Sequence, residues 1–200
     1  MGPQLREAWD EYRAGLSMPA GQWTQLPPRT LLEVGSGMGE AIIAAAADYD
    51  LAIGVDVHVR GLAATMRAVR DQGLDNVRLV RGDAVDVLRD QVPAGRLAEI
   101  HVWFPDPWPK AKHHKRRLIR PSVVALMAAR LRLGGVLRLA TDVGEYATQM
   151  VEVIASSDAF EPVGESGSVP RPPWRPVTRY ERYGRDRGNI PVELAFRRGG

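Results

Sequence analysis

The chain has 200 residues, 44% of them hydrophobic, and a formal net charge of +3, which is enough apolar material for one buried core and so for one domain. It contains no cysteine, which excludes disulfides, thiolate nucleophiles and cysteine-bound zinc. No apolar run reaches the length of a membrane span and no charged-then-apolar leader opens the sequence, so we expect a soluble, cytoplasmic protein without a membrane partner.

The first 28 residues are expected to form an N-terminal extension to a domain that covers residues 29–200. They hold a short amphipathic stretch at 5–13, followed by a linker with glycine and proline. No chemistry is assigned to this segment.

Beyond residue 28, short apolar segments alternate with segments of helical periodicity. This alternation predicts an α/β fold, a doubly wound and mostly parallel sheet covered by helices. Strands are expected at 30–34, 51–55, 77–81, 100–104 and 135–140, and helices at 40–48, 61–72, 85–91, 121–131 and 144–156. The proline-rich stretch 162–176 predicts an extended loop, and a final strand at 191–198 is expected to pair antiparallel at the sheet edge.

The first predicted strand leads into LLEVGSGMGE, with glycines at positions 35, 37 and 39. A dinucleotide-binding G-x-G-x-x-G turn needs a small residue where Glu40 stands, and a carboxylate there would repel a pyrophosphate. The pattern favours a ligand with a cationic centre and no phosphate, approached closely by the backbone at Gly35 and Gly37. S-adenosylmethionine fits that description, because it has a sulfonium, an amino acid end and an adenosine. A purely structural glycine turn is the alternative.

Acids recur at or just beyond the carboxyl ends of five predicted strands: Glu33, Asp56, Asp83, Asp106 and Asp142. Open α/β sheets bind ligands beyond those ends. Asp56 is placed to accept hydrogen bonds from ribose hydroxyls, or is a solvated strand-end residue. Asp83 could meet an adenine edge or cap the following helix. Independent caps would not need to coincide at five strand ends, so the set predicts a ligand site.

The fourth predicted strand ends in FPDPWP. Pro105 and Pro107 restrict the backbone, so Asp106 is expected on a pre-ordered turn and is the leading candidate for a catalytic carboxylate. Trp108 could stack on a splayed base or pack in the core.

A block of positive charge follows this turn. Between positions 107 and 141 there are nine Lys or Arg residues and no acid. Next to the predicted site, this density favours contact with RNA phosphates over a merely solvated surface. His113 and His114 are neighbours within the block and His101 lies in an apolar strand, where a hydrogen-bonded structural histidine is favoured over a metal ligand. No metal is expected.

Four segments in this order, LLEVGSGMGEA, FPDPWPKAKHHKRRL, LATDVGEYA and RPVTRYER, resemble the bacterial tRNA (guanine-N7)-methyltransferase family, over nearly the whole chain from position 33 to 198. The FPDPWPK segment with its following KRR is the most distinctive. The resemblance implies a class I, Rossmann-like methyltransferase fold, with a seven-stranded sheet and an antiparallel C-terminal edge. It also implies methyl transfer from S-adenosylmethionine to N7 of a guanine in the tRNA variable loop, giving 7-methylguanosine and S-adenosylhomocysteine.

Carried over residue by residue, the family's functional positions fall on three groups of residues. The implied cofactor contacts are Glu33, Asp56, Asp83 and Asp106. The implied substrate contacts are Lys110, Asp142, Thr178, Arg179, Tyr180 and Glu181. The implied RNA-contacting stretch comprises Lys112, His113, His114, Lys115, Arg116 and Arg117.

Three features depart from the family's usual pattern. Asp56 replaces the usual Glu and is shorter by one methylene, although it can still accept two ribose hydroxyls. Arg179 and Tyr180 replace Lys and Phe, so a planar fork stands in place of a point-like ammonium. The basic N-terminal arm common in the family is missing before Leu31.

Two other classes of protein share part of this pattern. A small-molecule or protein methyltransferase would have the glycine turn and Asp56, but would not need the six cations at 110–120. A catalytically silent RNA-binding module would have the cations, but would not need acids at five strand ends.

Overall fold

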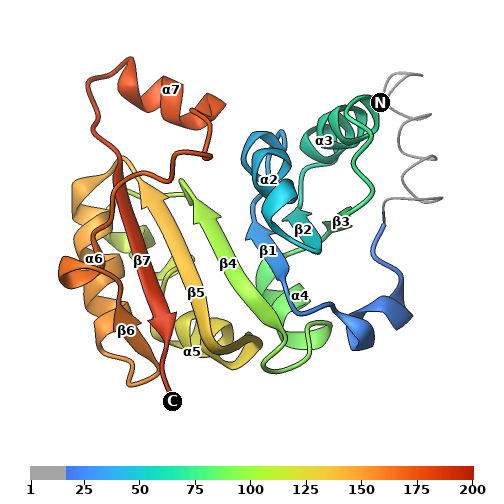
Figure 1. Ribbon diagram of the computed structural model, residues 1–200. Helices are drawn as coiled ribbons and strands as arrows, with labels where there is room; N and C mark the ends of the chain where they lie inside the picture. Colours follow the sequence, from blue (N-terminus) through green and yellow to red (C-terminus); the bar gives the residue numbers. More distant parts are fainter. Residues whose placement is uncertain (1–16) are drawn as a thin grey trace.

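A computed structural model describes residues 17–200 of the chain (Figure 1). The amphipathic stretch at 5–13 lies outside the described residues. The strands are β1 (Thr30–Val34), β2 (Leu51–Asp56), β3 (Val77–Arg81), β4 (Leu97–Trp103), β5 (Leu131–Thr141), β6 (Phe160–Pro162) and β7 (Val192–Arg198). The α-helices are α2 (Glu40–Ala45), α3 (Val59–Asp71), α4 (Ala84–Asp90), α5 (Pro121–Arg130), α6 (Gly144–Ala155) and α7 (Arg179–Arg185). Short 3-10 segments are η1 (Ala20–Gln25), η2 (Ala46–Asp48), η3 (Ala111–Arg116) and η4 (Glu165–Gly167).

The seven strands form one sheet in the order β3-β2-β1-β4-β5-β7-β6, which confirms the predicted doubly wound fold. Neighbours among β1 to β5 pair in parallel, whereas β7 pairs antiparallel with β5 and with β6. The chain moves outward from β1 to β3 and then returns to the other side of β1 at β4. Doubly wound sheets bind their ligands at such a reversal, beyond the carboxyl ends of the strands, which here are the ends of β1 and β4.

Alternate residues of the strands pack against helices on opposite faces of the sheet. On one face, side chains such as Leu32 and Ile100 join α4, α5 and α6 in the larger buried cluster. On the other face, side chains such as Leu31 and Leu79 join α2 and α3. Trp23 of η1 is also part of the larger cluster.

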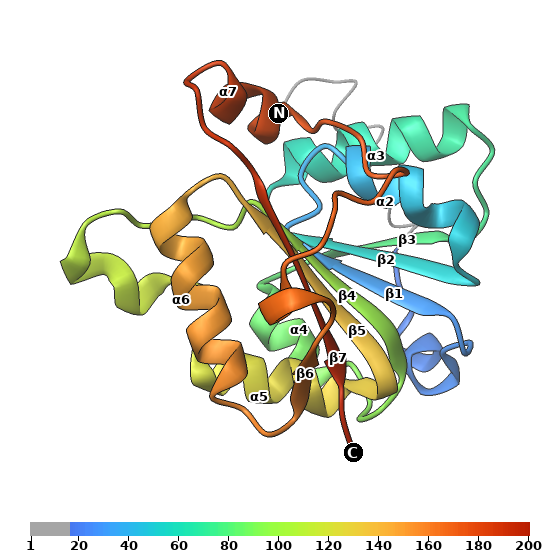
Figure 2. The same cartoon turned by 60° about the vertical axis from the view of Figure 1, so that its left-hand side comes forward.

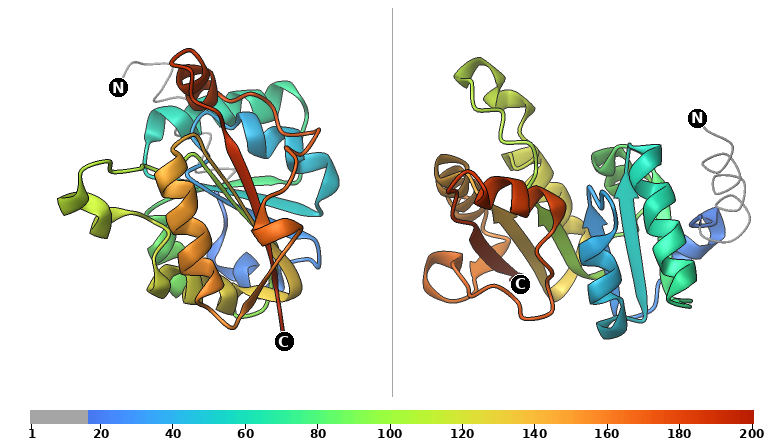
Figure 3. Two further views of the ribbon diagram at one scale, coloured as in Figure 1. Left: turned by 90° about the vertical axis from the view of Figure 1, so that its left-hand side faces the viewer. Right: turned by 90° about the horizontal axis from the view of Figure 1, so that it is seen from above.

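Two structures project from the end of the sheet where the parallel strands finish. Helix α7 lies above the arrowheads of the central strands (Figure 1). The segment around η3, between β4 and α5, extends away from the body of the molecule (Figures 2 and 3). No helix in residues 17–200 is long and apolar enough to cross a membrane.

The structure changes several predicted boundaries. The predicted helix at 40–48 divides into α2 and η2, and β4 and β5 begin earlier than expected. The predicted final strand is antiparallel, as expected, but it is not at the edge: β6, which was not predicted as a strand, takes that position. Helix α7 was not predicted, and it places four of the implied substrate residues at or next to its first turn.

Candidate functional site

The glycine turn after β1 is held in a conformation that glycine alone adopts readily. Gly35 and Gly37 have φ angles of 70° and 55°, which other residues rarely adopt. The turn also packs closely on α3, because a Cβ at Gly61 would lie 2.2 Å from the carbonyl oxygen of Gly37. Neither glycine adds a side chain of its own to the turn, and the ring of Tyr180 from α7 lies beside it, since a Cβ at Gly37 would be 3.8 Å from Tyr180 Cε2.

Asp56, at the end of β2, is part of that turn. Its Oδ2 accepts a hydrogen bond from the Gly37 amide at 2.8 Å, and its Oδ1 accepts one from the His58 amide at 2.7 Å. Each carboxylate oxygen has two lone pairs, so both can accept a second donor. The structure thus gives Asp56, which is 7% exposed, a role in shaping the turn, and its contact with ribose hydroxyls remains a prediction.

Glu33 lies inside the protein near the end of β1. It is 2% exposed, and the indole Nε1 of Trp103 donates a hydrogen bond to its Oε2 at 3.2 Å. Burial raises the pKa of the Glu33 carboxyl to about 8, against the lowering effect of the Trp103 bond. A carboxyl in this state becomes ionised readily when a cation binds beside it.

Asp83, at the start of α4, caps that helix. Its Oδ1 accepts a hydrogen bond from the Val85 amide at 2.8 Å. The capping role left open by the sequence is therefore present, and the contact to adenine remains a prediction.

The Asp106 turn is bracketed by two residues with positive φ angles, 50° at Phe104 and 42° at Trp108. Non-glycine residues with such angles cluster at functional sites. The Asp106 side chain is exposed. The guanidinium of Arg116 lies 4.0 Å from the Trp108 ring centroid, so one face of the indole is covered and a base could stack only on the other.

Arg117 differs from the rest of the basic block. It is 1% exposed, and its guanidinium donates to Glu145, Gln149 and the carbonyl oxygen of Pro107. The expectation that Arg117 contacts RNA does not fit this burial. The exposed cations of the block are Lys110, Lys112, Lys115 and Arg116, and the two histidines His113 and His114 are half-buried.

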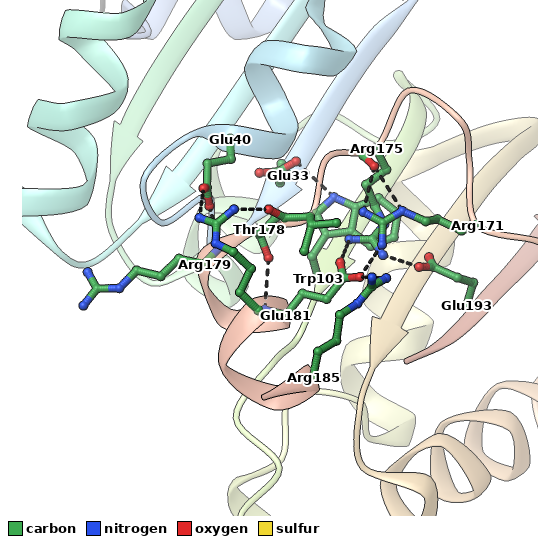
Figure 4. A network of polar contacts seen from close by, with 12 residues as sticks. Glu33, Glu40, Trp103, Arg171, Arg175, Thr178, Arg179, Glu181, Arg185 and Glu193 are labelled. Carbon is green, nitrogen blue, oxygen red and sulfur yellow. Dashed lines mark hydrogen bonds and ion pairs between the residues drawn. The ribbon is translucent and has the colours of Figure 1, made fainter. Parts of the chain in front are cut away.

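Helix α7 is held in place by contacts at several of the predicted site positions (Figure 4). Thr178 caps it, with its Oγ1 accepting from the Glu181 amide at 3.4 Å. Glu40 of α2 accepts from the Arg179 amide and from the Arg182 side chain, both at 2.8 Å. The helix is thereby tied to the element that follows the glycine turn.

Asp142, after β5, faces the end of the same helix. Its Oδ2 accepts a hydrogen bond from Asn189 Nδ2 at 2.8 Å. A Cβ at Gly184 would lie 2.0 Å from that oxygen, so only glycine allows this approach. The exposed side chains of Arg179 and Tyr180 remain available on the surface of α7.

Glu181 does not lie at a surface. It is fully buried, and its carboxylate is paired with Arg171, Arg175 and Arg185. Burial raises the pKa of this carboxyl, but the arginine contacts outweigh that effect and the pKa is lowered. The implied contact between Glu181 and substrate does not fit this position. Arg175, which the sequence analysis did not single out, is the central partner.

His101 has the structural role that the sequence favoured. It is fully buried, and its Nε2 lies 2.9 Å from Glu99 Oε2. Burial lowers the pKa of its imidazole despite that contact.

The sequence matches a protein family model described as "Putative methyltransferase" over residues 28–193. It is 46% identical to the tRNA (guanine-N(7)-)-methyltransferase of Aromatoleum aromaticum, covering 85% of this chain and 66% of that protein. It is 42% identical to the protein of the same name from Streptomyces avermitilis, covering 97% of this chain and 69% of that protein. The chain thus spans about two thirds of the length of these two relatives.

Solved structures with low sequence identity share the fold. The 16S rRNA methyltransferase KamB superposes with a TM-score of 0.60 at 18% identity, covering 90% of this chain and 92% of that one. Geranyl diphosphate methyltransferase in complex with SAM gives a TM-score of 0.52 at 16% identity, covering 90% of this chain and 85% of that one. The same backbone architecture therefore occurs in methyltransferases that act on very different substrates.

Proposed function

Because the chain belongs to the tRNA (guanine-N(7)-)-methyltransferase family, we propose that it transfers a methyl group from S-adenosylmethionine to N7 of a guanine in the tRNA variable loop. The observation that carries this proposal is the order of segments at one end of the sheet: the glycine turn follows β1, the Asp106 turn follows the neighbouring parallel strand β4, and the basic segment η3 comes directly after it. Its substrate would place the protein in the cytoplasm.

The residues at the end of β1 and β2 suit the cofactor. Gly35 and Gly37 add no side chain of their own to the turn, and the remaining lone pairs of Asp56 can accept the ribose hydroxyls. Glu33 offers a buried carboxyl to the cationic part of the ligand. When bound, S-adenosylmethionine supplies an electrophilic methyl group attached to a sulfonium.

The acceptor chemistry makes few demands on the protein. Guanine N7 carries a lone pair on the Hoogsteen edge and loses no proton when it is methylated, so no strong general base is needed. The protein's task is to hold the base in line with the methyl group, which can lower the barrier by several kcal/mol. Positive charge arrives on the imidazole ring of the guanine, and the carboxylate of Asp106 is proposed to favour that arrival.

The exposed cations of η3 and its flanks suit the tRNA backbone. Lys112, Lys115 and Arg116 stand on a segment that projects beyond the Asp106 turn (Figure 2). Phosphates bound there would bring a nearby loop of the RNA to the strand ends.

The test is mass spectrometry of nucleosides from tRNA that has been incubated with the protein and labelled cofactor. Labelled 7-methylguanosine is expected. Cofactor binding without any labelled nucleoside, together with methylation of small acceptors, would favour a small-molecule methyltransferase. Absence of cofactor binding would favour a silent RNA-binding module.

The ionisation of Glu33 is expected to make the affinity for the cofactor depend on pH. With a pKa of about 8, the carboxyl is largely protonated at neutral pH and must lose its proton to attract a cation. Affinity for S-adenosylmethionine is therefore expected to rise by up to about tenfold per pH unit between pH 6 and pH 8. Above pH 8 the affinity should level off.

Isothermal titration at several pH values measures this effect, with Glu33→Gln as the control. Titration of the ligand itself is common to both proteins, so only the difference between them reports on Glu33. Parallel pH profiles for the two proteins would show that Glu33 does not meet the cation.

The salt dependence of tRNA binding is expected to distinguish the exposed cations of the basic block from the buried one. Replacing both Lys115 and Arg116 by Ala is expected to weaken binding and to reduce the slope of log K against log salt by about one to two, since fewer counterions are released. Arg117→Lys should leave the slope unchanged, because that side chain is buried. Filter binding at several salt concentrations provides the slopes. Equal slopes in wild type and the double variant would show that Lys115 and Arg116 do not contact tRNA phosphates.

A further inference from the structure

Arg175 occupies the centre of a buried cluster between α7, β7 and the end of β4 (Figure 4). Its side chain is fully buried. One terminal nitrogen donates to Glu181 Oε2 at 2.8 Å, and the other donates to Glu193 of β7. The guanidinium carbon lies 5.1 Å from the centroid of the Trp103 ring and 5.4 Å from that of Phe104.

These contacts connect two parts of the candidate site. Trp103 donates its indole hydrogen bond to Glu33, the carboxyl proposed to meet the cofactor. Glu181 lies in the first turn of α7, three residues after the Thr178 cap, and so fixes the segment that carries Arg179 and Tyr180. Arg175 is therefore in contact with the neighbour of the cofactor carboxyl on one side and with the base of the substrate segment on the other.

The chemical identity of the side chain matters in this arrangement. A planar guanidinium can bridge two carboxylates and lie against aromatic rings together, whereas an ammonium acts as a point charge. A buried ion pair is also a poor way to gain stability, because apolar side chains of the same volume often serve equally well. In addition, Arg175 Nε is buried and has no hydrogen-bond partner in the described structure. The presence of an arginine at this position is best explained by the geometry that it imposes.

We propose that Arg175 is a positioning residue for methyl transfer. It fixes α7 through Glu181, and it fixes Trp103, which is the hydrogen-bond partner of Glu33. The acceptor and cofactor sites thereby keep one relative geometry. The inference rests on the proposed function for its kinetic consequence. Its structural consequence, that Arg175 fixes α7, does not depend on that function.

Arg175→Lys is the principal test, since it keeps the charge and removes the fork. The turnover number on tRNA is expected to fall about ten- to a hundredfold, the scale of a misplacement of about 1 Å between reacting groups. The dissociation constant of tRNA should change less than about threefold, with an unchanged salt slope, because a buried side chain releases no phosphate counterions. Hydrogen exchange of the α7 amides should become faster.

Arg78→Lys is the matched control. Arg78 is also held by protein acceptors, the carbonyl oxygens of Asp75 and Val77, but near the beginning of β3 and outside the basic block. It should keep normal turnover and normal exchange in α7. Arg175→Met has a side chain of similar size and no charge, and it separates a loss of folding from a loss of positioning. This variant should remain folded, and its turnover number should be at least as low as that of Arg175→Lys.

Two results would overturn the proposal. One is a turnover number within about twofold of wild type for Arg175→Lys, measured well below its unfolding temperature. The other is unchanged exchange in α7. If wild-type protein forms no 7-methylguanosine, the proposed function fails, and the exchange of α7 amides still decides whether Arg175 positions this helix.

Discussion

Asp106→Asn is expected to reduce the single-turnover rate of methyl transfer by about ten- to a thousandfold, the range found for loss of one preorganised electrostatic contact. Asparagine keeps the size and one acceptor oxygen but removes the charge. Within residues 17–200 no hydrogen bond or ion pair engages the Asp106 carboxylate, and the side chain is exposed. It is therefore free to act on a bound base.

The measurement is a single turnover with both substrates saturating, accompanied by direct binding of each. Affinity for tRNA should change little, because it is distributed over several phosphate contacts. Asp86→Asn is a suitable control, because Asp86 is an exposed acid on α4 that pairs with Arg89. A near-normal rate would remove Asp106 from the catalytic step, and a lost cofactor affinity with a normal rate at saturation would assign it to cofactor binding.

Asp56→Ala is expected to weaken binding of S-adenosylmethionine by about tenfold to more than a hundredfold. Ribose hydroxyls would lose acceptors whose charged hydrogen bonds each contribute about 1.5–3 kcal/mol. The amides of Gly37 and His58 would also lose their common acceptor, so the glycine turn would loosen. Affinity for tRNA should stay close to that of wild type.

Asp50 offers a control at the opposite end of the same strand. Its carboxylate also accepts a backbone hydrogen bond, from the Arg29 amide at 3.0 Å, but next to the beginning of β2. Asp50→Ala should leave cofactor affinity unchanged in isothermal titration. Equal losses of cofactor and tRNA affinity in Asp56→Ala would indicate general damage to the fold in place of a specific contact.

The central sheet could be predicted because its signals are local. Apolar segments of strand length, separated by segments of helical periodicity, indicate where β1 to β5 lie in the sequence. Because these strands are parallel, their carboxyl ends lie at one edge of the sheet. The glycines at 35 and 37 could likewise be assigned to a tight turn, since the positive φ angles there exclude most other residues.

The burial of charged residues could not be predicted in the same way. Arg117 lies in a run of exposed cations, and nothing next to it in sequence indicates that Glu145 will pair with it. Arg175 and Glu193 are also far apart in the chain and meet only because β7 is inserted between β5 and β6. Such pairs depend on the tertiary fold.

Helix α7 did carry a local signal. Thr178 and Glu181 have the spacing of a capping box, in which a Thr side chain accepts from the amide three residues later, and the structure contains that bond. The prolines before it predicted an extended loop, and the family resemblance implied substrate contacts for these residues. The motif nevertheless begins a helix, and its glutamate turns inward to the arginines.

The two positive φ angles around Asp106 bear on the stability of the whole protein. Each costs a non-glycine residue about 1–2 kcal/mol, in a domain whose total free energy of unfolding is of the order of 5–15 kcal/mol. Phe104 and Trp108 together therefore give up a measurable share of that total. Glycine at these positions would remove that backbone cost, but it would also remove the packing of Phe104 against the Trp103 cluster and the contact of Trp108 with Arg116. The segment that presents Asp106 thus combines a strained backbone with aromatic contacts that offset the strain.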